Sequence, residues 1–238
     1  MRNLMIIGLF CSVLLIMTYK VLLFSTGLLL LACHHEEKPA LAPAAGPSVE
    51  RLIDGNLAFR KSVPRSEIEA LAHEQHPFAV VVSCSDSRVP PELIFDQGLG
   101  DLFVVRTAGN IVGEYELGSI EYAVANLHTP VIIVLGHDEC GAIHAFHEHK
   151  NDKLPGYIQS IVDYIKQEKE LKNIDESSPS CMRLLVKGNV LHGVHVLKQD
   201  PMLANLIRQE KLTIVGAVYH LSDGSVEILQ DTPVNIGW

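Results

Sequence analysis

Two runs of apolar, β-branched residues are each followed directly by a cluster of polar residues that can bind a metal. Residues 78–83 (Phe-Ala-Val-Val-Val-Ser) precede Cys84, and residues 131–136 (Val-Ile-Ile-Val-Leu-Gly) precede His137. Continuous apolar runs of this kind are typical of strands buried on both faces, as in a parallel sheet. Open α/β sheets place their active sites just past the carboxyl ends of such strands. We therefore expect the two polar clusters to lie together at one edge of a sheet.

The rest of the chain alternates between short apolar segments and amphipathic ones. We expect strands at residues 78–83, 102–105, 131–135, 212–219 and 226–229. We expect helices from Ser48, at 66–76, 91–96, 116–127, after the second polar cluster to about 147, and at 156–171, 179–199 and 201–211. This alternation predicts an α/β fold with a mostly parallel central β-sheet flanked by helices. The turn signal Ser222-Asp223-Gly224-Ser225 predicts a C-terminal antiparallel strand.

The polar clusters supply a set of three zinc ligands. Cys84, His137 and Cys140 would leave one coordination position open, which is the arrangement of a catalytic rather than a structural zinc site. His137 and Cys140 are three residues apart, as on one face of the first turn of a helix. Asp86 and Arg88 are two apart, so an extended loop lets them form a bidentate carboxylate–guanidinium pair. Such a pair would keep Asp86 ionised beside the metal.

Together the two clusters resemble the signature of the β-class carbonic anhydrases. The matching stretches are Cys84-Ser85-Asp86-Ser87-Arg88-Val89-Pro90 and His137-x-x-Cys140-Gly141, supported by residues 103–106, 108–110 and 214–217. The resemblance covers roughly residues 49–232. It implies a lyase that carries out the reversible hydration of CO₂ to bicarbonate and a proton, with one Zn²⁺ per subunit.

The resemblance also implies roles for individual residues. Cys84, His137 and Cys140 are the expected zinc ligands. Asp86 would accept a hydrogen bond from the zinc-bound hydroxide, and Arg88 would anchor Asp86.

A second group of expectations concerns substrate binding and regulation. By resemblance, Gln97 and Gly141 are the expected substrate-binding residues. The family also has a closed form in which the aspartate, here Asp86, becomes the fourth zinc ligand. Members that switch with bicarbonate carry a Trp three residues before the first cysteine, where this chain has Val81. We therefore expect an open site near neutral pH, with Asp86 as a ligand only in a closed form at lower pH.

Two other functions fit the same residues. A related zinc hydrolase of carbonyl sulfide or carbon disulfide would share the ligands, so only an assay or the pocket mouth separates it from a carbonic anhydrase. A non-catalytic zinc-stabilised binding module would have no use for the oriented carboxylate of Asp86. Family members build their active site at a dimer interface, so we expect a homodimer or homotetramer whose N-terminal helices pack on the partner.

The N-terminus predicts export. Residues 1–32 resemble a signal peptide, and Leu30-Leu31-Ala32-Cys33 has the form of a lipobox with Cys33 as the lipidated residue. Counting from Met17 gives a compact leader, and a plain signal anchor is the alternative. Residues 33–48, rich in Pro and Ala, are expected to be a tether to a zinc domain at 49–238. The predicted location is bacterial, lipid-anchored and periplasm-facing.

The charge and the cysteines fit that setting. The net charge of −9 argues against a nucleic-acid partner, because such binding depends on neutralising phosphates. Membrane attachment is therefore expected to come from the lipid on Cys33. In an oxidising compartment, zinc would protect Cys84 and Cys140, and Cys181 is expected to be a buried thiol.

Overall fold

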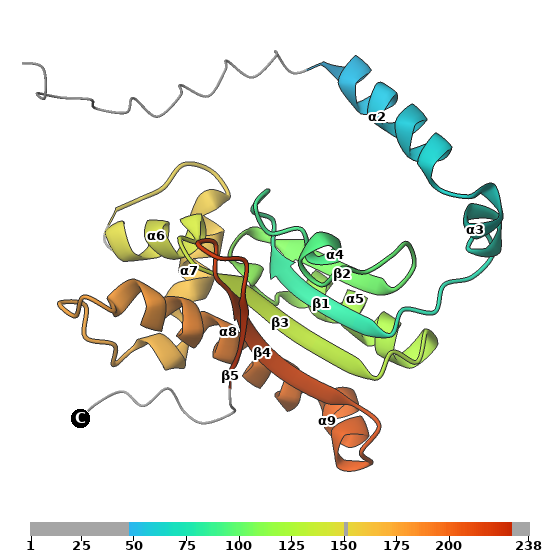
Figure 1. The fold of residues 1–238 in the computed structure, drawn as a ribbon. Helices are drawn as coiled ribbons and strands as arrows, with labels where there is room; N and C mark the ends of the chain where they lie inside the picture. Colours follow the sequence, from blue (N-terminus) through green and yellow to red (C-terminus); the bar gives the residue numbers. More distant parts are fainter. Residues whose placement is uncertain (1–47, 150–151, 230–238) are drawn as a thin grey trace, which may run out of the picture. The chain divides into compact units, whose positions relative to one another are not determined.

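The computed structural model describes residues 48–149 and 152–229 (Figure 1). The chain divides into two compact units between Val63 and Pro64. The predicted signal peptide, Cys33 and the tether up to residue 47 lie outside the described residues. Among the described residues, no helix is both long enough and apolar enough to span a membrane.

In the first unit the described structure is helix α2 (Val49–Ser62). Ser48 caps the helix as expected, since its hydroxyl accepts a hydrogen bond from the Arg51 backbone N–H at 3.2 Å. Leu52, Ile53 and Leu57 recur at helical spacing and are exposed. The helix therefore presents an apolar stripe.

The second unit contains a five-stranded sheet with the strand order β2-β1-β3-β4-β5. The strands are β1 (Ala79–Cys84), β2 (Leu102–Thr107), β3 (Val131–His137), β4 (Thr213–Tyr219) and β5 (Val226–Leu229). The pairs β1–β2, β1–β3 and β3–β4 are parallel, and β4–β5 is antiparallel. The predicted α/β fold is confirmed.

Helices precede the sheet and connect its parallel strands (Figure 1). They are α3 (Arg65–Ala70), α4 (Pro91–Ile94), α5 (Glu114–Asn126), α6 (Gly141–Glu148), α7 (Ile158–Lys166), α8 (Cys181–Gln199) and α9 (Pro201–Arg208), with 3₁₀ turns η1 (Ala108–Asn110) and η2 (Lys169–Leu171). Four predicted helices were too long. Those expected at 66–76, 91–96 and 201–211 end at Ala70, Ile94 and Arg208. The one expected at 156–171 stops because the N–H groups of Gln167 and Glu168 bond to carbonyls three residues back and tighten the last turn.

Both faces of the sheet are buried, as the apolar runs predict. In β1, Val80 and Val82 belong to the larger core cluster, and Val81 belongs to the cluster on the other face. Helix α8 packs on β3 and β4 over the larger cluster (Figure 1). Glycine allows this close approach, because a Cβ at Gly136 would lie 2.5 Å from a methyl carbon of Val190. The sheet that carries the strand ends is therefore packed on both faces.

Candidate metal centre

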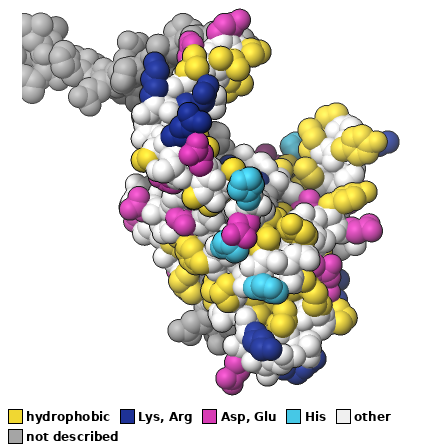
Figure 2. All heavy atoms as spheres, turned by 90° about the vertical axis from the view of Figure 1, so that its right-hand side faces the viewer, with side chains coloured by type: hydrophobic (Ala, Val, Ile, Leu, Met, Phe, Trp, Pro, Cys, Tyr) yellow, Lys and Arg dark blue, Asp and Glu magenta, His cyan; other side chains and the backbone are white. Residues whose placement is uncertain are grey.

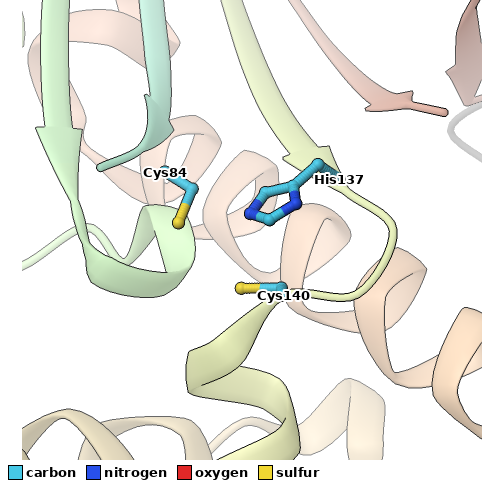
Figure 3. A group of neighbouring side chains, drawn as sticks. All are labelled: Cys84, His137 and Cys140. Atoms are coloured by element: carbon cyan, nitrogen blue, oxygen red, sulfur yellow. The ribbon is translucent and has the colours of Figure 1, made fainter. Parts of the chain in front are cut away.

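Three side chains converge at the carboxyl edge of the sheet (Figure 3). Cys84 is the last residue of β1, His137 is the last residue of β3, and Cys140 directly precedes α6. Their ligand atoms all lie within 4.8 Å of one another. The exposed fractions are 5% for Cys84, 0% for His137 and 1% for Cys140. The predicted grouping of these residues is confirmed, and a single metal ion could contact all of them.

The hydrogen bonds of His137 prepare one ring nitrogen for a metal. Its Nδ1 lies 2.7 Å from the carbonyl oxygen of Asp138, which can only accept, so Nδ1 carries the proton. The other nitrogen, Nε2, is buried and has no hydrogen-bond partner. A buried polar atom without a partner is costly unless it binds a ligand. This tautomer leaves a lone pair on Nε2 directed at the two thiols.

The two thiols favour a cation for electrostatic reasons. The hydrogen bond from Cys140 lowers the pKa of Cys84 to about 4. The backbone N–H of Gly109 also donates to the Cys84 sulfur, at 3.3 Å. The pKa of Cys140 is raised, by its contact with Cys84 and by burial. The pair alone therefore holds one negative charge, and a second thiolate requires a cation such as Zn²⁺, which prefers thiolate and imidazole ligands.

The link between His137 and Cys140 differs from the expected helical turn. His137 ends a strand and Cys140 is the cap that precedes α6, so the two do not share a helix face. Between them, Glu139 has a φ of 54°, in the left-handed region that is unfavourable for a side chain with a Cβ. This residue reverses the chain, and the turn brings both ligands to one point.

Asp86 and Arg88 form the predicted bidentate pair. Arg88 donates from Nε to Asp86 Oδ1 at 3.0 Å and from Nη2 to Oδ2 at 2.8 Å. The Arg88 backbone N–H adds a bond to Oδ1 at 2.9 Å. The side-chain bonds from Arg88 are the main reason that the pKa of Asp86 is lowered to about 2. Asp86 Oδ2 lies 3.9 Å from His137 Nε2, so an ionised carboxylate borders the ligand cluster.

Sequence reasoning missed the role of Arg106. From β2, its Nε donates to the carbonyl of Cys84 at 3.0 Å, and its Nη2 donates to the carbonyl of Asp86 at 2.7 Å. These bonds fix the backbone that carries a ligand and the neighbouring carboxylate. The stretch 103–106 stood out only as part of a resemblance, and no local pattern connects Arg106 with a loop twenty residues earlier.

The structure places the two expected substrate-binding residues differently. Gly141 is the first residue of α6, directly after Cys140, and a Cβ there would meet no heavy atom within 4 Å. Gln97 follows α4, and its amide donates to the carbonyl of Phe95 at 2.6 Å. Among the described residues, no hydrogen bond joins Gln97 to the ligand cluster.

Comparison with known proteins agrees with this chemistry. The family model described as carbonic anhydrase matches residues 79–226. The chain belongs to the carbonic anhydrase family. A carbonic anhydrase 2 of Mycobacterium tuberculosis is 38% identical over 200 residues, covering 78% of this chain and 93% of that protein. A carbonic anhydrase of Pseudomonas aeruginosa is 35% identical over 190 residues, covering 75% of this chain and 86% of that protein.

Solved structures specify the class. The β-carbonic anhydrase CcaA superposes with a TM-score of 0.69 at 30% identity, covering 76% of this chain and 94% of its own. Tetrameric β-carbonic anhydrases of Sordaria macrospora give a TM-score of 0.66 at 27% identity, covering 76% of this chain and 95% of theirs. The chain is therefore a carbonic anhydrase of the β class. The expectations of a zinc cofactor and of zinc-dependent hydration of CO₂ are confirmed.

Proposed function

We propose that this carbonic anhydrase hydrates CO₂ at an open zinc site, with Asp86 as the group that orients the reacting water. The observation that carries the proposal is the position of the Asp86 carboxylate beside three buried, converging ligand atoms. Cys84, His137 and Cys140 would hold the zinc. When bound, zinc acts as a Lewis acid that lowers the pKa of a coordinated water to about 7.

Asp86 supplies the orientation. An ionised carboxylate can only accept hydrogen bonds, and the low pKa of Asp86, about 2, keeps it ionised across the physiological range. It can therefore accept the O–H of the reacting water and turn an oxygen lone pair toward the carbon of CO₂. Arg88 acts through Asp86, because its two donors fix the plane of the carboxylate.

The same pair supports the open form. Both carboxylate oxygens of Asp86 accept hydrogen bonds from Arg88, and these bonds oppose a rotation of the carboxylate toward the metal as a fourth ligand. Val81 occupies the position of the tryptophan that switching members carry, and it is 1% exposed within the packed sheet. We propose that Asp86 becomes a ligand only in a closed form at lower pH.

Stopped-flow CO₂ hydration by the zinc-loaded enzyme tests this role. Asp86→Ala is expected to lower kcat/KM by about 10²-fold, the lower end of the effect of a positioned acid–base group. Asp175→Ala is the matched control, because Asp175 is also an aspartate with local hydrogen bonds, in its case to Ser177. An Asp86→Ala variant as fast as the wild type would overturn the role. Turnover of carbonyl sulfide without CO₂ hydration above the buffer rate would instead indicate a zinc hydrolase.

We propose that a second copy of the chain covers the surface near β2. A cavity of about 680 Å³ there is lined by residues that include Phe103, Tyr115 and Tyr122. Tyr115 is 86% exposed and Tyr122 is 48% exposed. Figure 2 shows apolar side chains interleaved with acidic side chains and histidines on one face of the molecule. Exposed aromatic side chains around a cavity favour association with a partner.

The proposed assembly is a homodimer or homotetramer, in keeping with the tetrameric Sordaria macrospora enzymes. The apolar stripe of α2 is the proposed contact of the N-terminal helix with the partner. Light scattering should show at least a dimer, and Tyr115→Glu should lower the apparent mass. A monomeric wild type with full activity would contradict the proposal.

We propose that the enzyme is exported and lipid-anchored at Cys33 on the periplasmic side of a bacterial membrane. The support is the lipobox-like sequence Leu30-Leu31-Ala32-Cys33 at the end of the apolar leader. Mass spectrometry of the mature N-terminus should find an acylated Cys33. An unprocessed Met1 or Met17 at the N-terminus would contradict it.

A further inference from the structure

The turn that presents two of the zinc ligands is strained. It runs from His137 to Cys140, and Glu139 within it adopts the left-handed backbone with a φ of 54°. Strained backbone of this kind persists only where the surrounding contacts hold it in place. One such contact comes from Arg88, whose Nη2 donates to the carbonyl of Glu139 at 3.2 Å.

A second contact holds the other side of the turn. The Asp138 backbone N–H donates to the carbonyl of Tyr219 at 3.1 Å. The Asp138 carboxylate accepts a hydrogen bond from Nδ1 of His220 at 2.8 Å. The carbonyl of the same Asp138 accepts the proton of the His137 ring. The position of Asp138 therefore sets the orientation of a zinc ligand.

His220 is itself held on several sides. Its backbone N–H donates to the carbonyl of Ser225 at 2.8 Å, within the β4–β5 turn. Its Nε2 lies 3.4 Å from Glu227 Oε2, and Glu227 Oε1 lies 2.6 Å from Lys187 Nζ. The hydrogen bond to Asp138 is the main reason that the pKa of His220 is raised, which favours a ring that donates from both nitrogens.

We propose that His220 is a positioning residue for the zinc centre, holding Asp138 and through it the strained turn that carries His137 and Cys140. This inference rests on the zinc centre assigned above. A row of contacts between oppositely charged groups joins the turn to β5 and α8. It runs from Asp138 through His220 and Glu227 to Lys187. His220 touches neither the substrate nor the reacting atoms, so its effect should appear first in how firmly the metal is held.

Side-chain replacements distinguish the contributions of the two ring nitrogens of His220. An asparagine amide occupies the place of Nδ1 and keeps a donor for Asp138. A glutamine amide reaches the place of Nε2, toward Glu227, and leaves Asp138 without its donor. His220→Ala removes both contacts. His192→Ala is the matched control, because His192 Nδ1 lies 2.7 Å from a Glu170 carboxylate oxygen and belongs to a different cluster.

The experiment measures zinc release from the full-length, zinc-loaded enzyme to a chromophoric chelator at constant pH. The spectrum of the cobalt-substituted enzyme, which reports ligand geometry directly, is the second readout. His220→Ala and His220→Gln should release zinc about tenfold faster than the wild type, as expected for the loss of a residue that supports a metal ligand. His220→Asn and His192→Ala should stay within about twofold of the wild-type rate, and only His220→Ala and His220→Gln should shift the cobalt bands.

Several outcomes would overturn the inference. One is zinc release at the wild-type rate by both His220→Ala and His220→Gln. Another is zinc release by His220→Asn that is as fast as by His220→Ala. If His192→Ala accelerated zinc release equally, a general loss of protein stability would explain the effect, and the role of His220 would be overturned. If His220→Ala does not fold, the comparison of Asn with Gln decides. A wild type that binds no zinc would overturn the metal centre itself. A wild type that binds zinc, together with variants that release it at the wild-type rate, would overturn only the role of His220.

Discussion

The guanidinium of Arg88 donates two side-chain hydrogen bonds to the carboxylate of Asp86, at 3.0 Å and 2.8 Å. The same Nη2 reaches the carbonyl of Glu139 at 3.2 Å. One arginine therefore joins the loop after β1 to the turn after β3. This double contact makes the orientation of the carboxylate and the shape of the ligand-bearing turn depend on each other.

The pH dependence of stability should reveal this pair. We expect Arg88→Gln to raise the pKa of Asp86 from about 2 toward its ordinary value of 3.8. A carboxyl whose pKa is lower in the folded state stabilises the fold above its unfolded pKa and loses that contribution as the pH falls. The wild type should therefore exceed the variant in free energy of unfolding above about pH 4, and the difference should shrink toward pH 2.

Urea denaturation at several pH values measures that difference, and carbon-detected NMR of the Asp86 carboxyl measures its pKa directly. Arg208→Gln, which changes an exposed arginine of α9, is the control. An Asp86 pKa that does not move in Arg88→Gln would contradict the explanation.

Zinc affinity should rise with pH. Without metal, the pKa of Cys140 is raised because Cys84 already carries the negative charge of the pair. Binding zinc to both thiolates must therefore release the Cys140 proton near neutral pH. Each proton released corresponds to a tenfold gain in affinity per pH unit. Calorimetry in buffers of different ionisation enthalpy should count at least one proton, and an affinity that is flat between pH 6 and 8 would refute the shared charge.

Removing Arg106 should loosen the loop that carries Cys84. In Arg106→Met the carbonyls of Cys84 and Asp86 lose the hydrogen bonds from the charged guanidinium, and we expect a loss of about 1–3 kcal/mol in the free energy of unfolding. Zinc release to a chelator should also be faster, since the loop holds a ligand. Arg208→Met serves as the control for removing an arginine. If Arg106→Met unfolded and released zinc as the wild type does, these hydrogen bonds would be shown not to hold the loop.

Gly136 should tolerate no side chain. A Cβ there would lie 2.5 Å from Val190, so Gly136→Ala must displace α8 or the end of β3. We expect a loss of about 1–3 kcal/mol in the free energy of unfolding, as for overpacked cores. Gly55→Ala, in an exposed helix with open space around the α-carbon, should be neutral or stabilising. Equal stability of the two variants in thermal denaturation would disprove the close approach.

Much of the site follows from local sequence patterns. The zinc ligands stand at the ends of apolar runs, and parallel strands that end at one edge bring them together. Asp86 and Arg88 are close enough in sequence for their pairing to be predicted from spacing. The helical placement of His137 and Cys140 was wrong, because a spacing of three residues does not distinguish a helical turn from a turn containing a left-handed residue such as Glu139.

The sequence by itself determined the ligand set of Cys84, His137 and Cys140, the neighbouring carboxylate and the α/β fold, since each is recognised from local patterns of apolar runs and the polar residues that follow them. Only the tertiary structure decided which residues support them. Arg106 and His220 act on residues 20 and 82 positions away, Asp86 and Asp138. Those contacts depend on the strand order, which places β2 beside β1 and β4 beside β3, and that order is set by packing across the whole sheet.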